Sequence, residues 1–68
     1  LRVGNVDCTV ITEKPAIAPR AAAMTEALAG ALQVAPGQVS VKATRGEGLG
    51  PEGRGECVTV QAVALLLA

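Results

Sequence analysis

The sequence predicts an α+β fold in which one helix packs on a small sheet. Three observations lead to this class: segments in which apolar and polar residues alternate, one alanine-rich segment with helical spacing, and a glycine-rich stretch in the second half. The expected order is β, α, β, glycine loop, β. A single helix covers only one face of such a sheet, so the other face must meet something else, and in a symmetric oligomer that is another copy.

The first strand is predicted over residues 6–12, V-D-C-T-V-I-T. Val6, Cys8 and Val10 share one face of this strand, and the residues between them share the other. Pro15 follows and stops the ladder, because proline has no amide hydrogen to donate.

A helix is predicted over residues 20–34, where Pro19 suits the first turn. Its larger apolar residues recur at four-residue spacing among many alanines: Met24, Leu28 and Leu32. We therefore expect an amphipathic helix that packs closely through small residues.

Two further strands are predicted on either side of a glycine-rich loop. Residues 38–44 follow the turn at Pro36-Gly37 and alternate, with these residues on one face: Val39, Val41 and Ala43. Residues 45–55 hold five glycines and one proline among eleven positions, which predicts a loop with at most one helical turn. Residues 56–68 begin with alternation and end in V-A-L-L-L-A, so we expect a final strand covered on both sides.

Composition excludes several classes of function. The 68 residues include no aromatic residue, so the core must be a thin one of Leu, Val and Ala, and we expect an oligomer, a fragment or both. The net charge is zero and the six basic residues are scattered between Arg2 and Arg54, which argues against nucleic acid as a partner. The chain has no membrane-length apolar run and no signal segment, so a cytoplasmic protein without a membrane partner is expected. A start at Leu1 rather than Met fits a fragment or a processed product.

The cysteines and the absence of histidine limit the metal chemistry. Cys8 and Cys57 are not spaced as C-x-x-C, and we expect two reduced, buried thiols rather than a disulfide. Two distant cysteines without any histidine cannot complete a tetrahedral zinc site. We therefore expect no zinc ligands in this chain.

Six motifs, in order and without an insertion, make the chain similar to the C-terminal half of the 2-C-methyl-D-erythritol 2,4-cyclodiphosphate synthase family. They are G-N-V-D-C-T-V-I (4–11), the proline-bearing turn (15–19), V-K-A-T (41–44), E-G-L-G (47–50), G-R-G-E (53–56) and A-V-A-L-L (62–66). Each motif is weak alone, but in register over nearly the whole chain they are specific.

The resemblance implies a metal-dependent, cyclising phosphorus-oxygen lyase of isoprenoid-precursor biosynthesis. Such an enzyme converts 4-diphosphocytidyl-2-C-methyl-D-erythritol 2-phosphate to the cyclic diphosphate and CMP, an intramolecular phosphoryl transfer that depends on positioning and charge neutralisation. The family works as a homotrimer with active sites between neighbouring subunits, and its zinc ligands come from the N-terminal half. That half is absent from residues 1–68, so we expect this chain alone to be inactive.

The resemblance also assigns roles to residues of this chain. The turn from Thr12 to Ala18 would hold the cytosine through backbone amides and carbonyls, and the strip from Thr44 to Glu47 would meet the diphosphate. Glu47 would bind magnesium or manganese, which usually need only one or two protein carboxylates when phosphates supply other ligands. Thr44 and Arg45 would be catalytic. The substrate-binding residues implied in this way are Thr12, Glu13, Lys14, Pro15, Ala16, Ile17, Ala18, Ala43, Thr44, Arg45, Gly46, Glu47, Pro51 and Arg54.

The chain departs from the family at three of these positions. Ala16 replaces a common lysine, which a backbone contact tolerates, and Pro51 replaces a common phenylalanine. Arg45 replaces a second threonine; an arginine can bind phosphate through two nitrogens, but its bulk and reach differ. Arg54 and Glu56 correspond to charged residues near the trimer axis, where some members bind an isoprenoid diphosphate or another anion.

Each segment also has an ordinary explanation. Residues 12–18 are a proline-bounded connection from strand to helix, Glu47 is an exposed loop residue, and Arg54 pairs with Glu56 on the surface. The alternative function is a small oligomeric binding or structural module, or an inactive fragment. Binding of a cytidine nucleotide distinguishes these readings from a synthase site.

Overall fold

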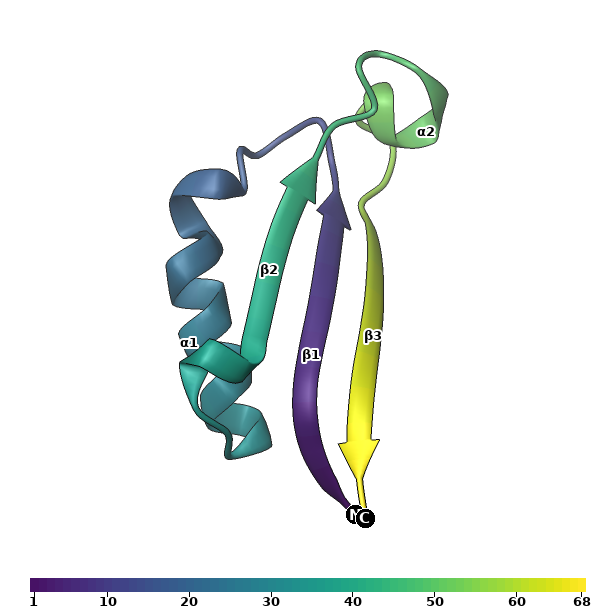
Figure 1. The fold of residues 1–68 in the computed structure, drawn as a ribbon. Helices are drawn as coiled ribbons and strands as arrows, with labels where there is room; N and C mark the ends of the chain where they lie inside the picture. The colour runs from purple at the N-terminus through teal and green to yellow at the C-terminus, as the bar shows by residue number, and fades with distance from the viewer.

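A computed structural model describes residues 1–68 and contains a three-stranded mixed sheet with one long helix beside it (Figure 1). The predicted α+β class and the order of the elements are confirmed. The elements are β1 (Arg2–Ile11), the 3-10 turn η1 (Ala18–Arg20), α1 (Ala21–Leu32), the 3-10 turn η2 (Pro36–Gln38), β2 (Val39–Thr44), α2 (Gly50–Gly53) and β3 (Thr59–Leu67). None of the helices is long and apolar enough to cross a membrane.

β1 is the central strand of the sheet, parallel to β2 and antiparallel to β3. It begins at Arg2 rather than at the predicted Val6, because its pairing with β3 continues until Arg2 lies opposite Leu67. The register shifts at Gly4, where an added Cβ would lie 3.1 Å from Leu67 Cδ1. The side-chain amide of Gln38 donates to the Gly4 carbonyl at 2.9 Å, so this irregular point still has a partner.

Two other predicted boundaries were wrong by a few residues. α1 ends at Leu32 because Gln33 adopts a left-handed conformation, with φ of 58°, which ends a helix. β3 begins at Thr59 rather than at Glu56, because the Glu56 amide donates back to the Pro51 carbonyl at 2.9 Å and closes the glycine loop.

The core lies between α1 and the helix-facing side of β1 and β2. Parallel register places Val6, Cys8 and Val10 opposite Val39, Val41 and Ala43, which confirms the predicted apolar faces. Met24 and Leu28 of α1 line an apolar space with Cys8, Val10 and Val41, as the helical spacing predicts. Leu32, the next residue in that spacing, is 40% exposed. Only 5 of the 68 residues are buried, so the core is as thin as the composition indicates.

β3 is apolar on both faces, as predicted, but residues 1–68 do not cover either face. Val60 and Leu66 point to the helix side and are 58% and 52% exposed, because α1 lies over the opposite edge of the sheet (Figure 1). Val63 and Leu65 point to the other side and are 72% and 54% exposed. The expected cover on both sides is therefore not supplied from within these residues.

Both cysteines are free, in agreement with the prediction of two thiols. Cys8 is buried, whereas Cys57 is exposed, so the expectation that both are buried was wrong for Cys57. Cys57 lies before the start of β3 and outside the sheet, which explains its exposure.

Gly30 is a glycine in the middle of α1 that the packing does not require. A Cβ added there meets no atom within 4 Å, and the residue does not have a positive φ. We expect Gly30→Ala to raise the free energy of unfolding by about 0.5–1 kcal/mol, because alanine loses less backbone entropy on folding. Urea unfolding followed by circular dichroism measures the change, and Gly37→Ala, also in open space but outside α1, is the matched control. A lower stability of the Gly30→Ala protein would contradict this.

Candidate functional site

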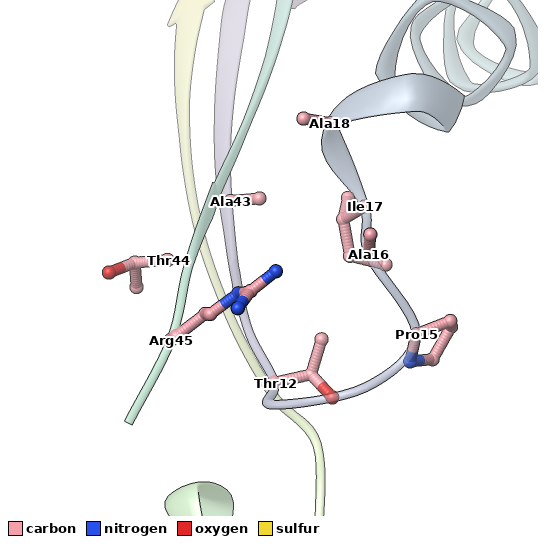
Figure 2. Close-up of a pocket in the computed structure, with 8 residues that line it drawn as sticks. All are labelled: Thr12, Pro15, Ala16, Ile17, Ala18, Ala43, Thr44 and Arg45. Carbon is pink, nitrogen blue, oxygen red and sulfur yellow. The ribbon is translucent and has the colours of Figure 1, made fainter. Parts of the chain in front are cut away.

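A pocket of about 150 Å³ lies where the chain leaves β1 and β2 at their carboxyl ends (Figure 2). This edge is where ligands bind in sheets with parallel strands. One wall is the connection between β1 and η1, and the other is the end of β2. We call it the turn pocket, and all eight residues that line it are among those that the family resemblance implies to bind substrate: Thr12, Pro15, Ala16, Ile17, Ala18, Ala43, Thr44 and Arg45.

Thr12 joins the two walls of the turn pocket and is only 4% exposed. Its amide donates to the Thr44 carbonyl at 3.1 Å, and its hydroxyl donates to the Lys14 carbonyl at 2.7 Å. The hydroxyl is therefore engaged in shaping the turn. Thr12 holds the pocket wall in place rather than offering a free donor to a ligand.

Backbone groups are available at the turn pocket. The amides of Ala16 and Ile17 donate to no other backbone group of the chain. β2 is an edge strand, and because the Thr44 carbonyl faces β1, the backbone polar groups of Ala43 and Arg45 face the open edge. Apolar side chains with nearby amides and carbonyls suit a flat heterocyclic ring. A cavity of about 150 Å³ is large enough to hold a benzene ring.

Thr44 and Arg45 lie at the end of β2 but point in opposite directions. Figure 2 shows the Arg45 guanidinium extending toward the turn that carries Ile17, while the Thr44 hydroxyl points away from it. Consecutive strand residues alternate between the two faces of a sheet, which explains the difference. The predicted phosphate strip is thus divided, and only Arg45 brings a side-chain charge to the turn pocket.

The glycine loop, residues 45–55, folds tightly on itself. A Cβ at Gly46 would lie 2.5 Å from the Gly53 amide nitrogen, and a Cβ at Gly53 would lie 2.6 Å from the Gly48 carbonyl carbon. Backbone therefore packs directly on backbone. The Gly48 amide also donates to Glu13 Oε1 at 3.3 Å, which ties the loop to the turn after β1.

A second, polar pocket of about 350 Å³ lies between that turn and the loop. It contains three of the predicted site residues, Glu13, Lys14 and Arg54, together with Gly53 and Gly55. The other predicted residues, Gly46, Glu47 and Pro51, line neither this pocket nor the turn pocket. Sequence reasoning did not assign Gly53 or Gly55 to a site, although their G-R-G motif was the available signal.

Two side-chain pairs fix the end of the loop. Arg54 donates from Nε and Nη2 to the two Glu56 carboxylate oxygens, each at 3.1 Å, so the ordinary surface pair is present. Thr59 donates its hydroxyl to Glu52 Oε2 at 2.7 Å and joins α2 to the start of β3. This hydrogen bond, with a smaller contribution from the charge of Arg54, holds the pKa of Glu52 below its ordinary value. The Glu52–Thr59 pair was not predicted, because nothing in the spacing marks it.

The residues of this chain fit a magnesium or manganese site but not a tetrahedral zinc site. Nowhere do three His, Cys, Asp or Glu side chains come together, and there is no histidine, so these residues do not fit a tetrahedral zinc site. Glu47 is exposed and has a left-handed backbone conformation, with φ of 53°. A single exposed carboxylate fits magnesium or manganese that also binds a phosphate and water.

Comparison with known proteins identifies similar chains. A model of the YgbB family matches residues 1–67. The bifunctional enzyme IspD/IspF of Anaeromyxobacter sp. is 59% identical over 66 residues, which are 97% of this chain and 17% of that protein. Among solved structures, 2C-methyl-D-erythritol 2,4-cyclodiphosphate synthase from Plasmodium vivax has a TM-score of 0.88 at 35% identity, over 91% of this chain and 41% of that one. IspF of Plasmodium falciparum, solved as a CDP complex, has a TM-score of 0.85 at 30% identity, over 88% and 38%. The chain thus spans less than half the length of each of these proteins.

Proposed function

Because this chain belongs to the YgbB family, we propose that it forms the nucleotide-binding wall of a 2-C-methyl-D-erythritol 2,4-cyclodiphosphate synthase. In that role it is the C-terminal half of the synthase domain. The reaction converts 4-diphosphocytidyl-2-C-methyl-D-erythritol 2-phosphate to the cyclic diphosphate and CMP. The observation that carries the proposal is the turn pocket, where eight of the implied substrate-binding residues gather around a space of single-ring size.

Each wall of the turn pocket has a role in this proposal. The cytosine ring enters between Ile17 and Ala43, and the free amides of Ala16 and Ile17 hold its polar edge. The diphosphate then extends along the end of β2 toward Thr44, Arg45 and the glycine loop. Thr12, Pro15 and Ala18 shape the pocket, and Glu13 and Lys14 continue the same turn beside Arg54. Gly46 and Pro51 belong to the glycine loop that borders the diphosphate in this proposal.

The reaction itself needs position and charge more than covalent chemistry from the protein. An oxygen of the 2-phosphate attacks the β-phosphorus, and the bond from that phosphorus to the bridging oxygen breaks, so CMP leaves with the electron pair. In this proposal Arg45 and Thr44 stabilise the developing charge from opposite sides of the end of β2, and holding the diphosphate at both ends keeps the attack in line. Glu47 would hold magnesium or manganese, which supplies further charge neutralisation when bound.

The remainder of the active site comes from outside residues 1–68 in this proposal. An N-terminal half supplies the zinc ligands, and neighbouring subunits of a homotrimer complete the site. The exposed apolar faces of β3 support this, since they are surfaces that such parts would cover. The competing function, a small binding or structural module, uses the same surfaces for assembly alone.

Cytidine diphosphate with magnesium should raise the melting temperature of the protein at its full natural length. At 100 times the dissociation constant, a ligand that binds only the folded state stabilises it by about 2.7 kcal/mol. Differential scanning fluorimetry measures the shift, and uridine diphosphate with magnesium is the control for base recognition. No shift with any cytidine nucleotide at saturation would contradict the proposal and favour the structural module.

The 68-residue chain alone should release no CMP from the substrate, because the zinc ligands come from the other half in this proposal. CMP release by a 68-residue chain that mass spectrometry shows to be pure would contradict the need for the other half.

A further inference from the structure

We propose that Arg45 gives the turn pocket a permanent cation that pairs, without a metal, with the phosphate nearest the ribose of the bound nucleotide. The inference rests on the proposed function, because it takes the cytosine ring as the occupant of the pocket. It goes further by assigning one residue the discrimination between a cytidine nucleotide and uncharged cytidine.

The charge of Arg45 is isolated from other charged side chains. Arg45 is the one charged residue among the eight that line the turn pocket. The two ion pairs of the chain join Lys42 to Asp7 and Arg54 to Glu56, and no side-chain hydrogen bond uses the Arg45 guanidinium. An arginine remains protonated at all physiological pH values, so this is an uncompensated positive charge at the mouth of an apolar pocket.

The turn pocket is small compared with a whole nucleotide. A pocket of about 150 Å³ accommodates one ring, so the ribose and the phosphates of a nucleotide must lie outside it. Arg45 lines the pocket and is exposed, so its side chain lies where the pocket opens to solvent, which is the mouth. Figure 2 shows its guanidinium extending toward the turn. The first phosphate beyond the ribose is the anionic group of the ligand that lies closest to this mouth. The planar guanidinium can bind two phosphate oxygens at once.

The proposal has two measurable consequences. With all divalent metal removed by a chelator, the protein should still bind CMP more tightly than cytidine, because the cation is a side chain. That preference should weaken as salt is added, since the pair lies at an exposed site and is screened. A pocket that depends on metal alone for phosphate recognition would bind the two ligands equally under these conditions.

The test uses the protein at its full natural length, in excess EDTA, with cytidine and CMP as the probes. Calorimetry gives the CMP affinity, and competition against CMP gives that of cytidine. Arg45→Gln should weaken CMP binding about ten-fold and leave cytidine binding unchanged, because one charge-assisted contact is lost. Arg45→Lys should recover part of the loss. Arg2→Gln removes the same charge at the far end of β1 and should change neither affinity.

Other results of these binding experiments would show whether the role of Arg45 or the proposed function itself is wrong. Equal losses for cytidine and CMP in the Arg45→Gln protein would overturn the proposal, because the guanidinium would then stack on the ring. Unchanged CMP binding would also overturn it and leave the proposed function intact. If the unaltered protein binds no cytidine compound with or without magnesium, the proposed function itself fails. A melting temperature within the range of the Arg2→Gln protein verifies that the Arg45 variants are folded.

Discussion

Replacing Gly46 by alanine should disrupt the glycine loop and remove diphosphate binding while the sheet stays folded. The new Cβ would lie 2.5 Å from the Gly53 nitrogen, 2.6 Å from the Gly53 Cα and 2.8 Å from the Leu49 carbonyl oxygen. All three are backbone atoms, so no side chain can rotate away and the loop itself must open. Overpacking of this kind typically costs about 1–3 kcal/mol. Because Arg45 and Glu47 flank Gly46, an opened loop displaces both groups proposed to meet the phosphates.

The neighbouring glycines provide graded controls for this prediction. Gly53→Ala should behave like Gly46→Ala, since its Cβ would lie 2.6 Å from the Gly48 carbonyl carbon. At Gly48 a Cβ meets nothing within 4 Å, and the cost comes only from its φ of 76°, about 1–2 kcal/mol. Urea unfolding and hydrogen exchange of residues 45–55 measure stability and loop order, and calorimetry with cytidine diphosphate and magnesium measures binding. Gly46→Ala with the stability and affinity of Gly48→Ala would contradict the loop contact.

The isolated 68-residue chain should associate with itself as its concentration rises, and two substitutions on β3 should prevent this. Val63 and Leu65 lie on the same face of β3 and are 72% and 54% exposed, beside an unpaired strand edge. Apolar strands with a free edge pair with other chains. Val63→Lys combined with Leu65→Lys should shift the species seen by sedimentation velocity to the monomer, because two charges then face each other across any such contact.

This experiment needs a control that distinguishes the effect of added charge on association from the effect of lost apolar surface. Ser40→Lys combined with Gln61→Lys adds the same two charges at exposed polar positions, and it should leave most of the association in place. In the assembly proposed above, with an N-terminal half and neighbouring subunits present, the β3 double variant should lower the melting temperature more than the control does, because the proposed covering surface can no longer pack there. An isolated chain that is monomeric at every concentration would contradict the prediction.

The sequence pattern was sufficient for the order of the elements, whereas the residues that line the turn pocket were named through the family resemblance and their binding role stays a prediction. Alternation placed Val6, Cys8 and Val10 on the core face, and the proline-bearing turn marked where the chain leaves β1. Both signals are local, and local patterns are what a single sequence records best. The family resemblance added the residues of both walls of the pocket, which are the turn after β1 and the end of β2.

Features that depend on contacts between distant residues were not predicted. The extension of β1 to Arg2 comes from its pairing with Leu67, and the order of the glycine loop comes from Gly46 against Gly53. The exposure of Cys57 depends on where β3 starts, which a hydrogen bond from Glu56 decides. The opposite directions of Thr44 and Arg45 could have been predicted from the sequence, because successive strand residues point to opposite faces. The predicted alternation was applied to residues 39–44 but not to Arg45.

Because β1 pairs with β3 as far as Arg2 and Leu67, the sheet cannot be completed during synthesis until β3 has been made. β1, α1 and β2 leave the ribosome before β3 and can assemble as a parallel unit, with one side of the central strand unpaired. That side waits for β3, and joining strands so distant in sequence is slow compared with forming local contacts. Until then the backbone edge of β1 is open to other chains, and this interval includes both the synthesis of residues 45–67 and the slow pairing of β3 with β1.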